Sequence, residues 1–291
     1  MRSLTLDNVT ATAVASFAAL PDARQRQLVQ ALVAGLHQVA KDVKLTHAEW
    51  RAALGFLHRV GDISDDTRSE FSLLSDVTGL SSLVDMLASD PDDRAVTPGS
   101  NLGPFHASGS PWKPNPASLI DGNPGRRVLL RGRVCSSSGQ PLPEATLDFW
   151  QNAADGLYWQ QDPNQPTDNL RCQLKMDAEG RFEIATIRPV PYQIPLDGPV
   201  WHELVHPAGL SGWRPAHYHL IATAPGHRTL VTELFDAEDP YLDSDAVLGV
   251  RETLVGRYER LHDAAACARL GVPGDECLVM NVELRLAALE N

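Results

Sequence analysis

The sequence predicts an α+β protein in which a helical region precedes an antiparallel β-sandwich. Up to residue 88, apolar side chains recur at the spacing of amphipathic helices. From residue 128 onward they recur at every second position, in short runs separated by proline and glycine, which is typical of sandwiches. A polar, helix-breaking stretch, residues 89–100, lies between the two patterns. We therefore expect two regions, residues 1–100 and residues 101–291.

The helical pattern is clearest in residues 22–43. Leu28, Leu32, Leu36 and Val39 follow one another at i, i+4, i+8 and i+11, so they form one apolar stripe. Core packing alone can account for such a stripe. The next helix is expected to open at Thr46-His-Ala-Glu49, a capping box in which each side chain bonds to the other residue's backbone N–H. Two more helices are expected over residues 65–76 and 80–88.

The second region is predicted to consist of short strands. Each run alternates apolar and polar side chains and ends at a turn signal. The expected strands are residues 128–135, 145–151, 181–187, 217–222, 229–235 and 279–286.

Composition and charge exclude several classes of partner. The formal net charge is −12, and the chain shows no basic stripe that could follow a phosphate backbone, so we expect no nucleic-acid partner. No apolar run is long enough to cross a membrane, and we expect a cytoplasmic protein without membrane insertion. The four cysteines show no C-x-x-C spacing, which fits free thiols in a reducing compartment.

Four side chains with metal-binding chemistry stand out: Tyr158, Tyr192, His217 and His219. Alternate residues of a strand share a face, so the two histidines can bind one metal ion. A phenol, with a pKa of about 10, binds a metal only after it has lost its proton, and this requires a strongly Lewis-acidic ion. Hard anionic oxygens favour a hard cation of high charge. Two phenolates with two imidazoles therefore suit ferric iron, whereas zinc is usually held by cysteine, histidine or carboxylate.

Several motifs surround these side chains and extend the pattern along the chain. They are Asp155-Gly-Leu-Tyr158, Thr186-Ile-Arg-Pro-Val-Pro-Tyr192, Gly212-Trp-Arg-Pro-Ala-His-Tyr-His219, Arg68-Ser-Glu-Phe-Ser-Leu-Leu-Ser-Asp76, Leu102-Gly-Pro-Phe-His106 and Asp239-Pro-Tyr-Leu-Asp-Ser-Asp-Ala-Val247. Together they resemble the intradiol ring-cleavage dioxygenases, and within that family the hydroxyquinol 1,2-dioxygenases.

This resemblance implies a non-haem Fe(III) enzyme that uses O2 to open a catechol-type ring between its two hydroxylated carbons. Tyr158, Tyr192, His217 and His219 would hold the iron, and Tyr192 would also accept a proton from the substrate. Arg214 would stabilise negative charge on the ring. By the same resemblance, residues 1–100 would form a homodimer interface with lipid between the helices, and residues 101–291 would carry the iron.

The resemblance also implies a flat, largely apolar substrate slot. Its expected lining is Leu73, Asp76, Leu102, Gly103, Phe105, Ile194, Pro195, Arg214, Glu233 and Val247. Asp76 is the polar exception, because its carboxylate can accept a hydrogen bond from a third ring hydroxyl. The expected substrate is therefore hydroxyquinol (benzene-1,2,4-triol), cleaved to 3-hydroxy-cis,cis-muconate or maleylacetate.

Three positions depart from the family pattern. Asn101 stands where the family usually has an aliphatic residue, Trp201 where smaller or basic residues are familiar, and Glu233 where glutamine or histidine is expected. We expect Glu233 to pair with Arg214. The departures keep catechol or chlorocatechol 1,2-dioxygenase activity, giving cis,cis-muconates, as an alternative. Alternatives of another class are a β-sandwich binding module without iron and a zinc hydrolase built on the two histidines and Glu233.

Overall fold

The computed structural model describes residues 3–65, 68–88 and 95–289. The chain divides into two compact units, Met1–Arg59 and Val60–Asn291. The boundary between the two units thus lies well before residue 100, where the sequence pattern changes. This difference arises because two of the expected helices belong to the same compact unit as the strands.

The first unit is helical. It contains α1 (Val9–Ser16), α2 (Ala23–Asp42) and most of α3 (His47–Asp62). The predicted capping box at the start of α3 is confirmed, because Thr46 N–H donates to Glu49 Oε2 at 2.8 Å and Glu49 N–H donates to Thr46 Oγ1 at 3.3 Å. The apolar stripe of α2 is exposed, with between 53% and 63% of each side chain accessible at Leu28, Leu32, Leu36 and Val39.

The second unit begins with two short helices, α4 (Glu70–Val77) and α5 (Leu80–Ala88). Helix α4 starts later than the sequence predicts because Ser69 caps it, accepting a hydrogen bond from Ser72 N–H at 3.1 Å. A third helix, α6 (Ala264–Leu270), was not predicted. Among the described residues, no single helix is long and apolar enough to cross a membrane, and only the sharply bent pair α4 and α5 passes the same test on length and composition.

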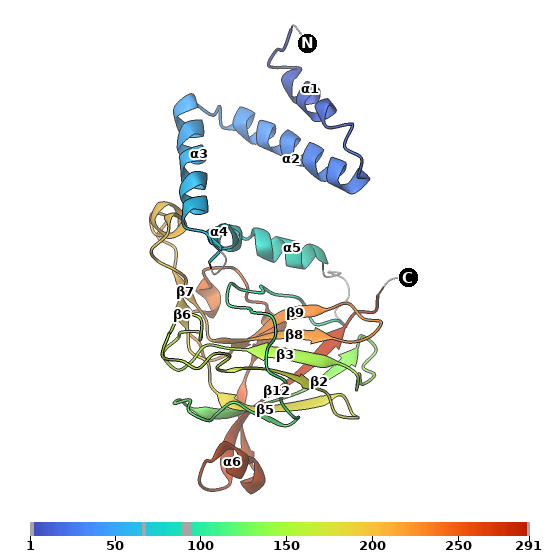
Figure 1. Cartoon of the computed structure of the whole chain (residues 1–291), viewed down its shortest axis with the longest axis vertical. Helices are drawn as coiled ribbons and strands as arrows, with labels where there is room; N and C mark the ends of the chain where they lie inside the picture. Colours follow the sequence, from blue (N-terminus) through green and yellow to red (C-terminus); the bar gives the residue numbers. More distant parts are fainter. Residues whose placement is uncertain (1–2, 66–67, 89–94, 290–291) are drawn as a thin grey trace. The chain divides into compact units, whose positions relative to one another are not determined.

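The rest of the second unit contains two five-stranded sheets and one two-stranded sheet (Figure 1). All six predicted strands are present in these sheets, together with several shorter ones. In spatial order, the first sheet is β1 (Ala117–Ser118), β5 (Arg181–Ile187), β2 (Arg127–Ser136), β12 (Glu276–Leu286) and β11 (Tyr258–His262); the second is β10 (Val255–Gly256), β9 (Leu230–Asp236), β8 (His217–Thr223), β3 (Thr146–Trp150) and β4 (Arg171–Lys175); and the small sheet is β6 (Tyr192–Gln193) with β7 (Trp213–Arg214).

Both large sheets are mixed, so the expectation of purely antiparallel strands is wrong. The long strand β12 pairs in parallel with β2, and β1 with β5 and β10 with β9 are also parallel. The pattern in the sequence could not reveal this, because side chains alternate between faces with period two in both kinds of pairing.

One hydrophobic cluster draws side chains from both large sheets. It includes Leu130 of β2 and Ile184 of β5 from one sheet, and Leu147 of β3 and Leu220 of β8 from the other. On β8 the residues that enter this cluster are Tyr218, Leu220 and Ala222. Alternation along the strand therefore directs the intervening side chains, the two histidines among them, to the opposite face.

Candidate metal centre and substrate cavity

Strand β8 places His217 and His219 on one face, as predicted. Both imidazoles are buried, and their Nε2 atoms lie 3.1 Å apart. Tyr218, between them, points into the core, where its hydroxyl is 2.6 Å from that of Tyr258. Two ring nitrogens at this separation can approach the same point, which is the geometry that a shared metal ion requires.

Neighbouring groups fix the state of both imidazoles. His217 Nδ1 lies 2.6 Å from the backbone carbonyl of Pro215, which can only accept, so Nδ1 carries the hydrogen and the lone pair remains on Nε2. Burial, followed by the charge of Arg214, lowers the pKa of His217 to about 4. Burial, followed by His217, holds the pKa of His219 well below its usual value. Both rings are therefore neutral near pH 7, which is the form that binds metals.

The ring of His219 is held from two sides. Trp150, at the end of β3, stacks on it with ring centroids 4.8 Å apart and planes 3° apart. On another side lies Gly103, whose φ is +73° and where an added Cβ would come within 3.0 Å of His219 Cε1. Glycine is thus required here both by the backbone conformation and by the close approach to the imidazole.

The two tyrosines come from separate segments of the chain, and both rings lie beside the histidines. Tyr158 follows β3 and Tyr192 begins β6, and their ring centroids lie 5.6 Å apart. Phe105 stacks on Tyr158 with ring centroids 4.4 Å apart. The ring of Tyr192 lies 5.6 Å from that of His217.

Both phenol groups are buried, and a nearby cation would stabilise them in the deprotonated form. Burial is the main cause that raises the pKa of both tyrosines, for Tyr158 well above its usual value. The hydroxyl of Tyr158 is buried and has no hydrogen-bond partner among the described residues. A buried, unpaired polar group is costly. A metal ion of high charge would remove this cost, because it would replace the phenol proton. The residues present therefore fit the ferric ion that the sequence suggests.

An ionic network with Arg214 at its centre lies next to the histidines. Arg214 Nη1 donates to Glu233 Oε1 at 2.8 Å, and Arg214 Nε donates to Asp245 Oδ1 at 3.1 Å. The expected pairing of Glu233 with Arg214 is confirmed. The second oxygen of Glu233 accepts a hydrogen bond from the hydroxyl of Ser100 at 2.6 Å.

All three charged groups of this network are buried, and Glu233 and Arg214 are ionised. Burial opposes ionisation of Glu233, but Arg214 outweighs it and lowers the pKa to about 2. Burial also opposes the charge of Arg214, whereas Asp245 and Glu233 raise its pKa well above the usual value. His217, His219 and Glu233 offer ligand atoms within 4.8 Å of one another. Because both oxygens of Glu233 are already hydrogen-bonded, the carboxylate is a poorer ligand than the unpaired hydroxyl of Tyr158.

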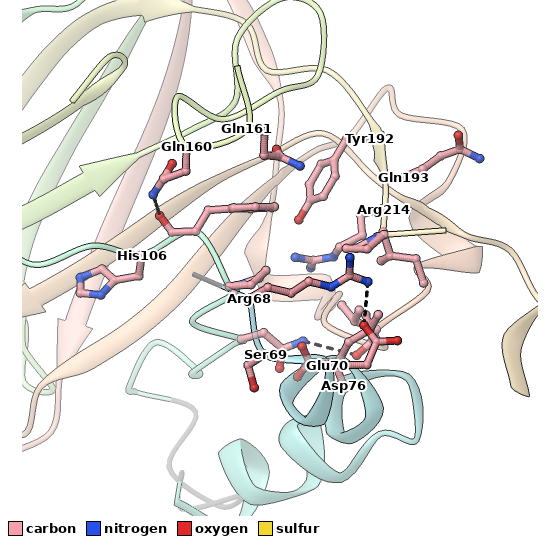
Figure 2. A pocket seen from close by; sticks show the side chains of 18 of the residues that line it. Arg68, Ser69, Glu70, Asp76, His106, Gln160, Gln161, Tyr192, Gln193 and Arg214 are labelled. Carbon is pink, nitrogen blue, oxygen red and sulfur yellow. Dashed lines mark hydrogen bonds and ion pairs between the residues drawn. The ribbon is translucent and has the colours of Figure 1, made fainter. Parts of the chain in front are cut away.

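A cavity of about 760 Å³ opens beside Tyr192 and Arg214. In Figure 2, Tyr192 and Arg214 come from β6 and β7, and Asp76 comes from α4 on the other side of the cavity. The strands β6 and β7 pair Tyr192 with Arg214 directly, so both reach the cavity from one small sheet. Eight of the predicted substrate-binding residues line it: Leu73, Asp76, Gly103, Phe105, Ile194, Pro195, Arg214 and Val247.

Two of the predicted substrate-binding residues do not line this cavity. Glu233 is fully buried behind Arg214, where it pairs with the guanidinium and with Ser100. Leu102 is 43% exposed, while its neighbours Asn101 and Gly103 line the cavity.

The structure adds lining residues that the sequence did not single out for this role. Arg68 lies at the cavity, where its guanidinium bonds to Glu70 at 2.9 Å and to Asp197 at 2.8 Å (Figure 2). Glu70 Oε1 in turn accepts a hydrogen bond from Val200 N–H at 3.1 Å. These bonds connect the start of α4 to residues 197–200. Other lining residues that were not predicted include His106, Trp159, Gln160 and Gln161.

Comparison with known proteins assigns the family. A model described as "Dioxygenase" matches residues 102–287, and one described as "Catechol dioxygenase N terminus" matches residues 22–96. The chain belongs to the intradiol ring-cleavage dioxygenases. It is 41% identical over 256 residues to 6-chlorohydroxyquinol 1,2-dioxygenase of Cupriavidus pinatubonensis, covering 88% of this chain and 92% of that one.

Two further members of this dioxygenase family are similar over most of their length. Hydroxyquinol 1,2-dioxygenase of a Rhizobium species is 37% identical over 261 residues, which is 89% of this chain and 88% of the relative. The crystal structure of hydroxyquinol 1,2-dioxygenase from Pseudomonas putida DLL-E4 superimposes with a TM-score of 0.86 at 39% identity, covering 98% of this chain and 99% of the other. The chain is thus an intradiol dioxygenase, a class of non-haem iron enzyme.

Proposed function

We propose that this dioxygenase opens the ring of hydroxyquinol between its two vicinal hydroxylated carbons, giving 3-hydroxy-cis,cis-muconate or its tautomer maleylacetate. The observation that carries the proposal is Asp76, a carboxylate that lines the same cavity as Tyr192 and Arg214. The names of several relatives, which are hydroxyquinol and 6-chlorohydroxyquinol dioxygenases, support it.

We propose that Tyr158, Tyr192, His217 and His219 hold a ferric ion. The buried unpaired hydroxyl of Tyr158 and the 3.1 Å separation of the histidine Nε2 atoms support this set. Ferric iron bound there would withdraw electrons from a chelated aromatic diolate and make the ring reactive toward O2. Glu233 is not included among the ligands, because Arg214 and Ser100 bond to its two oxygens.

The residues around the metal would act on protons and charge. Tyr192 combines a cavity-facing position with a pKa raised mainly by burial, so its phenolate is a strong base and can take a proton from the entering diol. Arg214 is buried beside Tyr192 and keeps its charge. It would stabilise negative charge that builds up on the ring as cleavage proceeds.

Asp76 would select the third hydroxyl. Burial raises its pKa, and a hydrogen bond from Ser81 partly offsets that effect. Ser81 uses only part of the acceptor capacity of this carboxylate, and the remaining capacity is costly to leave unmet in a largely apolar slot. Hydroxyquinol brings a further donor and catechol does not, so the site is expected to discriminate between the two rings.

The test is the ratio of specificity constants for hydroxyquinol and catechol. A hydrogen bond to a charged acceptor contributes about 1.5 to 3 kcal/mol, so Asp76→Ala should lower the ratio by about one to two powers of ten. Asp243→Ala, a change of the same type at an exposed position outside the cavity, is the matched control. A wild type that prefers catechol, or an unchanged ratio in Asp76→Ala, would contradict the substrate assignment.

We further propose an organisation for the whole chain. Residues 1–100 would form a helical homodimer interface, with lipid between the helices, and residues 101–291 a β-sandwich catalytic domain. The exposed apolar stripe of α2 supports the interface, and the hydrophobic cluster shared by both large sheets supports the sandwich. All four cysteines are free and buried, which supports a cytoplasmic location.

A further inference from the structure

Asn101 is a buried polar side chain whose acceptor atom has no partner. The residue is 4% exposed, and no described group donates to its Oδ1. It also lines the substrate cavity, together with Asp76, Gly103 and Val247. Buried amide oxygens are almost always hydrogen-bonded in native proteins, so an exception beside a ligand cavity calls for a donor from within that cavity.

The surroundings of Asn101 fix which end of the amide is unpaired. Nδ2 donates to the carbonyl of Val247 at 3.4 Å, and the same carbonyl also accepts from the hydroxyl of Ser82 at 3.4 Å. A carbonyl oxygen can only accept, so the amide nitrogen must face it and Oδ1 must be the other atom. The hydrogen bond to Val247 therefore accounts for the amide nitrogen of Asn101, whereas the amide oxygen has no partner that would give it a structural role.

The backbone that carries Asn101 is held equally firmly. Ser100, the preceding residue, donates its N–H to Val231 at 3.0 Å, and its hydroxyl donates to Glu233 at 2.6 Å. Gly103, two residues after Asn101, packs against His219. The side chain cannot easily turn away to find a partner elsewhere, because both flanking segments are tied to the metal-binding face of the sheet.

We propose that Asn101 Oδ1 accepts a hydrogen bond from a ring substituent other than the hydroxyl that meets Asp76. The inference rests on the function proposed above and refines its substrate class: the preferred ring is a hydroxyquinol that carries one more hydrogen-bond donor, a hydroxyl or an amino group. Asp76 and Asn101 each bring an acceptor to the cavity lining, whereas hydroxyquinol has only one hydroxyl left once the vicinal pair is bound to the metal. A chlorine substituent at the same place would bring no donor and would face the lone pairs of Oδ1.

The test is ligand binding to the iron-loaded protein under anaerobic conditions, where no ring can be cleaved. The ligands are hydroxyquinol and the three tetrahydroxybenzenes, which between them place a fourth hydroxyl on every free ring carbon of hydroxyquinol. In the wild type at least one tetrahydroxybenzene should bind about tenfold more tightly than hydroxyquinol, the gain expected from one additional neutral hydrogen bond.

Two variants decide whether Asn101 is responsible for that gain. Asn101→Leu is nearly the same size and lacks the acceptor, and Asn101→Val lacks it with less bulk in case leucine disturbs the packing. In both variants, the dissociation constant of hydroxyquinol divided by that of the tightest-binding tetrahydroxybenzene should fall about tenfold, to near one. Asn281→Leu, the same change at an exposed position of β12, should leave the ratio as in the wild type.

The outcomes separate this inference from the proposed function. It is overturned if no tetrahydroxybenzene binds the wild type more tightly than hydroxyquinol, or if the gain persists in both Asn101 variants. A wild type that binds catechol more tightly than hydroxyquinol would instead count against the role of Asp76. The Asn101 comparison would still be readable in that case, because it uses the ratio between two rings that both carry the third hydroxyl.

Discussion

At the scale of single residues, the candidate site contains side chains that can bind a metal ion, such as His217 and His219, and other side chains that hold them in place. The spacing of His217 and His219 implies a shared face, and the structure shows both rings there. The hydrogen bond from Ser100 to Glu233 joins residues 133 positions apart, and no local sequence pattern can predict such a contact. Asn101 was recognised only as a departure from the family pattern, since its unpaired oxygen becomes apparent only when its neighbours are known.

Gly103 provides a test of how the neighbours of His219 support the metal site. Gly103→Ala would place a Cβ within 3.0 Å of His219 Cε1 and force the imidazole to move. Mutations of residues that orient a ligand typically weaken metal binding by about tenfold to a hundredfold. We expect a coloured wild type with phenolate-to-iron absorption, and a weaker band with less iron per chain in Gly103→Ala after competition with a chelator.

Gly109→Ala is the matched control for that experiment. Gly109 has a similar φ of +79°, so alanine suffers the same backbone strain, but no atom lies within 4 Å of its added Cβ. Equal iron loss in both variants would show that strain alone causes the effect. A colourless wild type that is active with zinc would contradict the ferric site itself.

At the scale of helices and strands, periodicity and capping located the main elements, and the pairing of the strands could not be predicted. The capping box at Thr46 and the alternation in β8 and β12 correspond to elements in the structure. The parallel pairing of β2 with β12 depends on contacts between residues about 150 positions apart, for example Leu129 with Val279. Short elements such as β6 and β7 lie below the length at which alternation is visible, although they place Tyr192 and Arg214.

The edge strand β4 yields a prediction for pH dependence, because its residue Cys172 is buried. Cys172, which pairs with Phe149 of β3, is fully buried, and burial raises the pKa of its thiol to about 12. The thiolate is the reactive form, so a raised pKa means slower alkylation at any given pH. At pH 8 its thiolate fraction should be about a thousandfold lower than that of a thiol with a pKa near 9.

Alkylation by iodoacetamide, followed for each cysteine by mass spectrometry between pH 7 and 10, measures this effect. In the folded protein the rate at Cys172 should stay low and continue to rise across the range, whereas in the urea-unfolded chain it should reach half of its maximum near pH 9 and approach a plateau by about pH 10. If Cys172 reacts in the folded protein at pH 8 as fast as in the unfolded chain, the thiol is not buried as the structure shows.

At the scale of the whole molecule, the sequence distinguishes a helical part from a strand-rich part, and the two compact units divide at a different point of the chain, between Arg59 and Val60. The change of pattern near residue 100 follows secondary structure, whereas the units Met1–Arg59 and Val60–Asn291 reflect which elements pack together. Helices α4 and α5 belong with the strands because Asp76 lines the cavity and Ser82 bonds to residues 247 and 248. Such long-range packing leaves no periodic signal in the sequence.

The proposed dimer gives a prediction at this scale. Size-exclusion chromatography with light scattering should give twice the chain mass of 31.7 kDa for the wild type. Leu32→Glu combined with Leu36→Glu places two charges on the exposed apolar stripe of α2 and should shift the protein toward monomer. Gln27→Glu lies about 140° around the helix from Leu32 and should leave the dimer intact. A monomeric wild type would contradict the proposed interface.

The central claim is that this chain binds ferric iron through Tyr158, Tyr192, His217 and His219 and uses it to open a vicinal diol with O2. The most direct test is product analysis after reaction of purified, iron-loaded protein with hydroxyquinol under ¹⁸O2. The claim predicts one O2 consumed per ring and a hydroxymuconate or maleylacetate with one ¹⁸O in each of its two new carboxyl groups. Ring cleavage beside, and not between, the vicinal hydroxylated carbons, or no O2 uptake by protein that retains its iron, would contradict it.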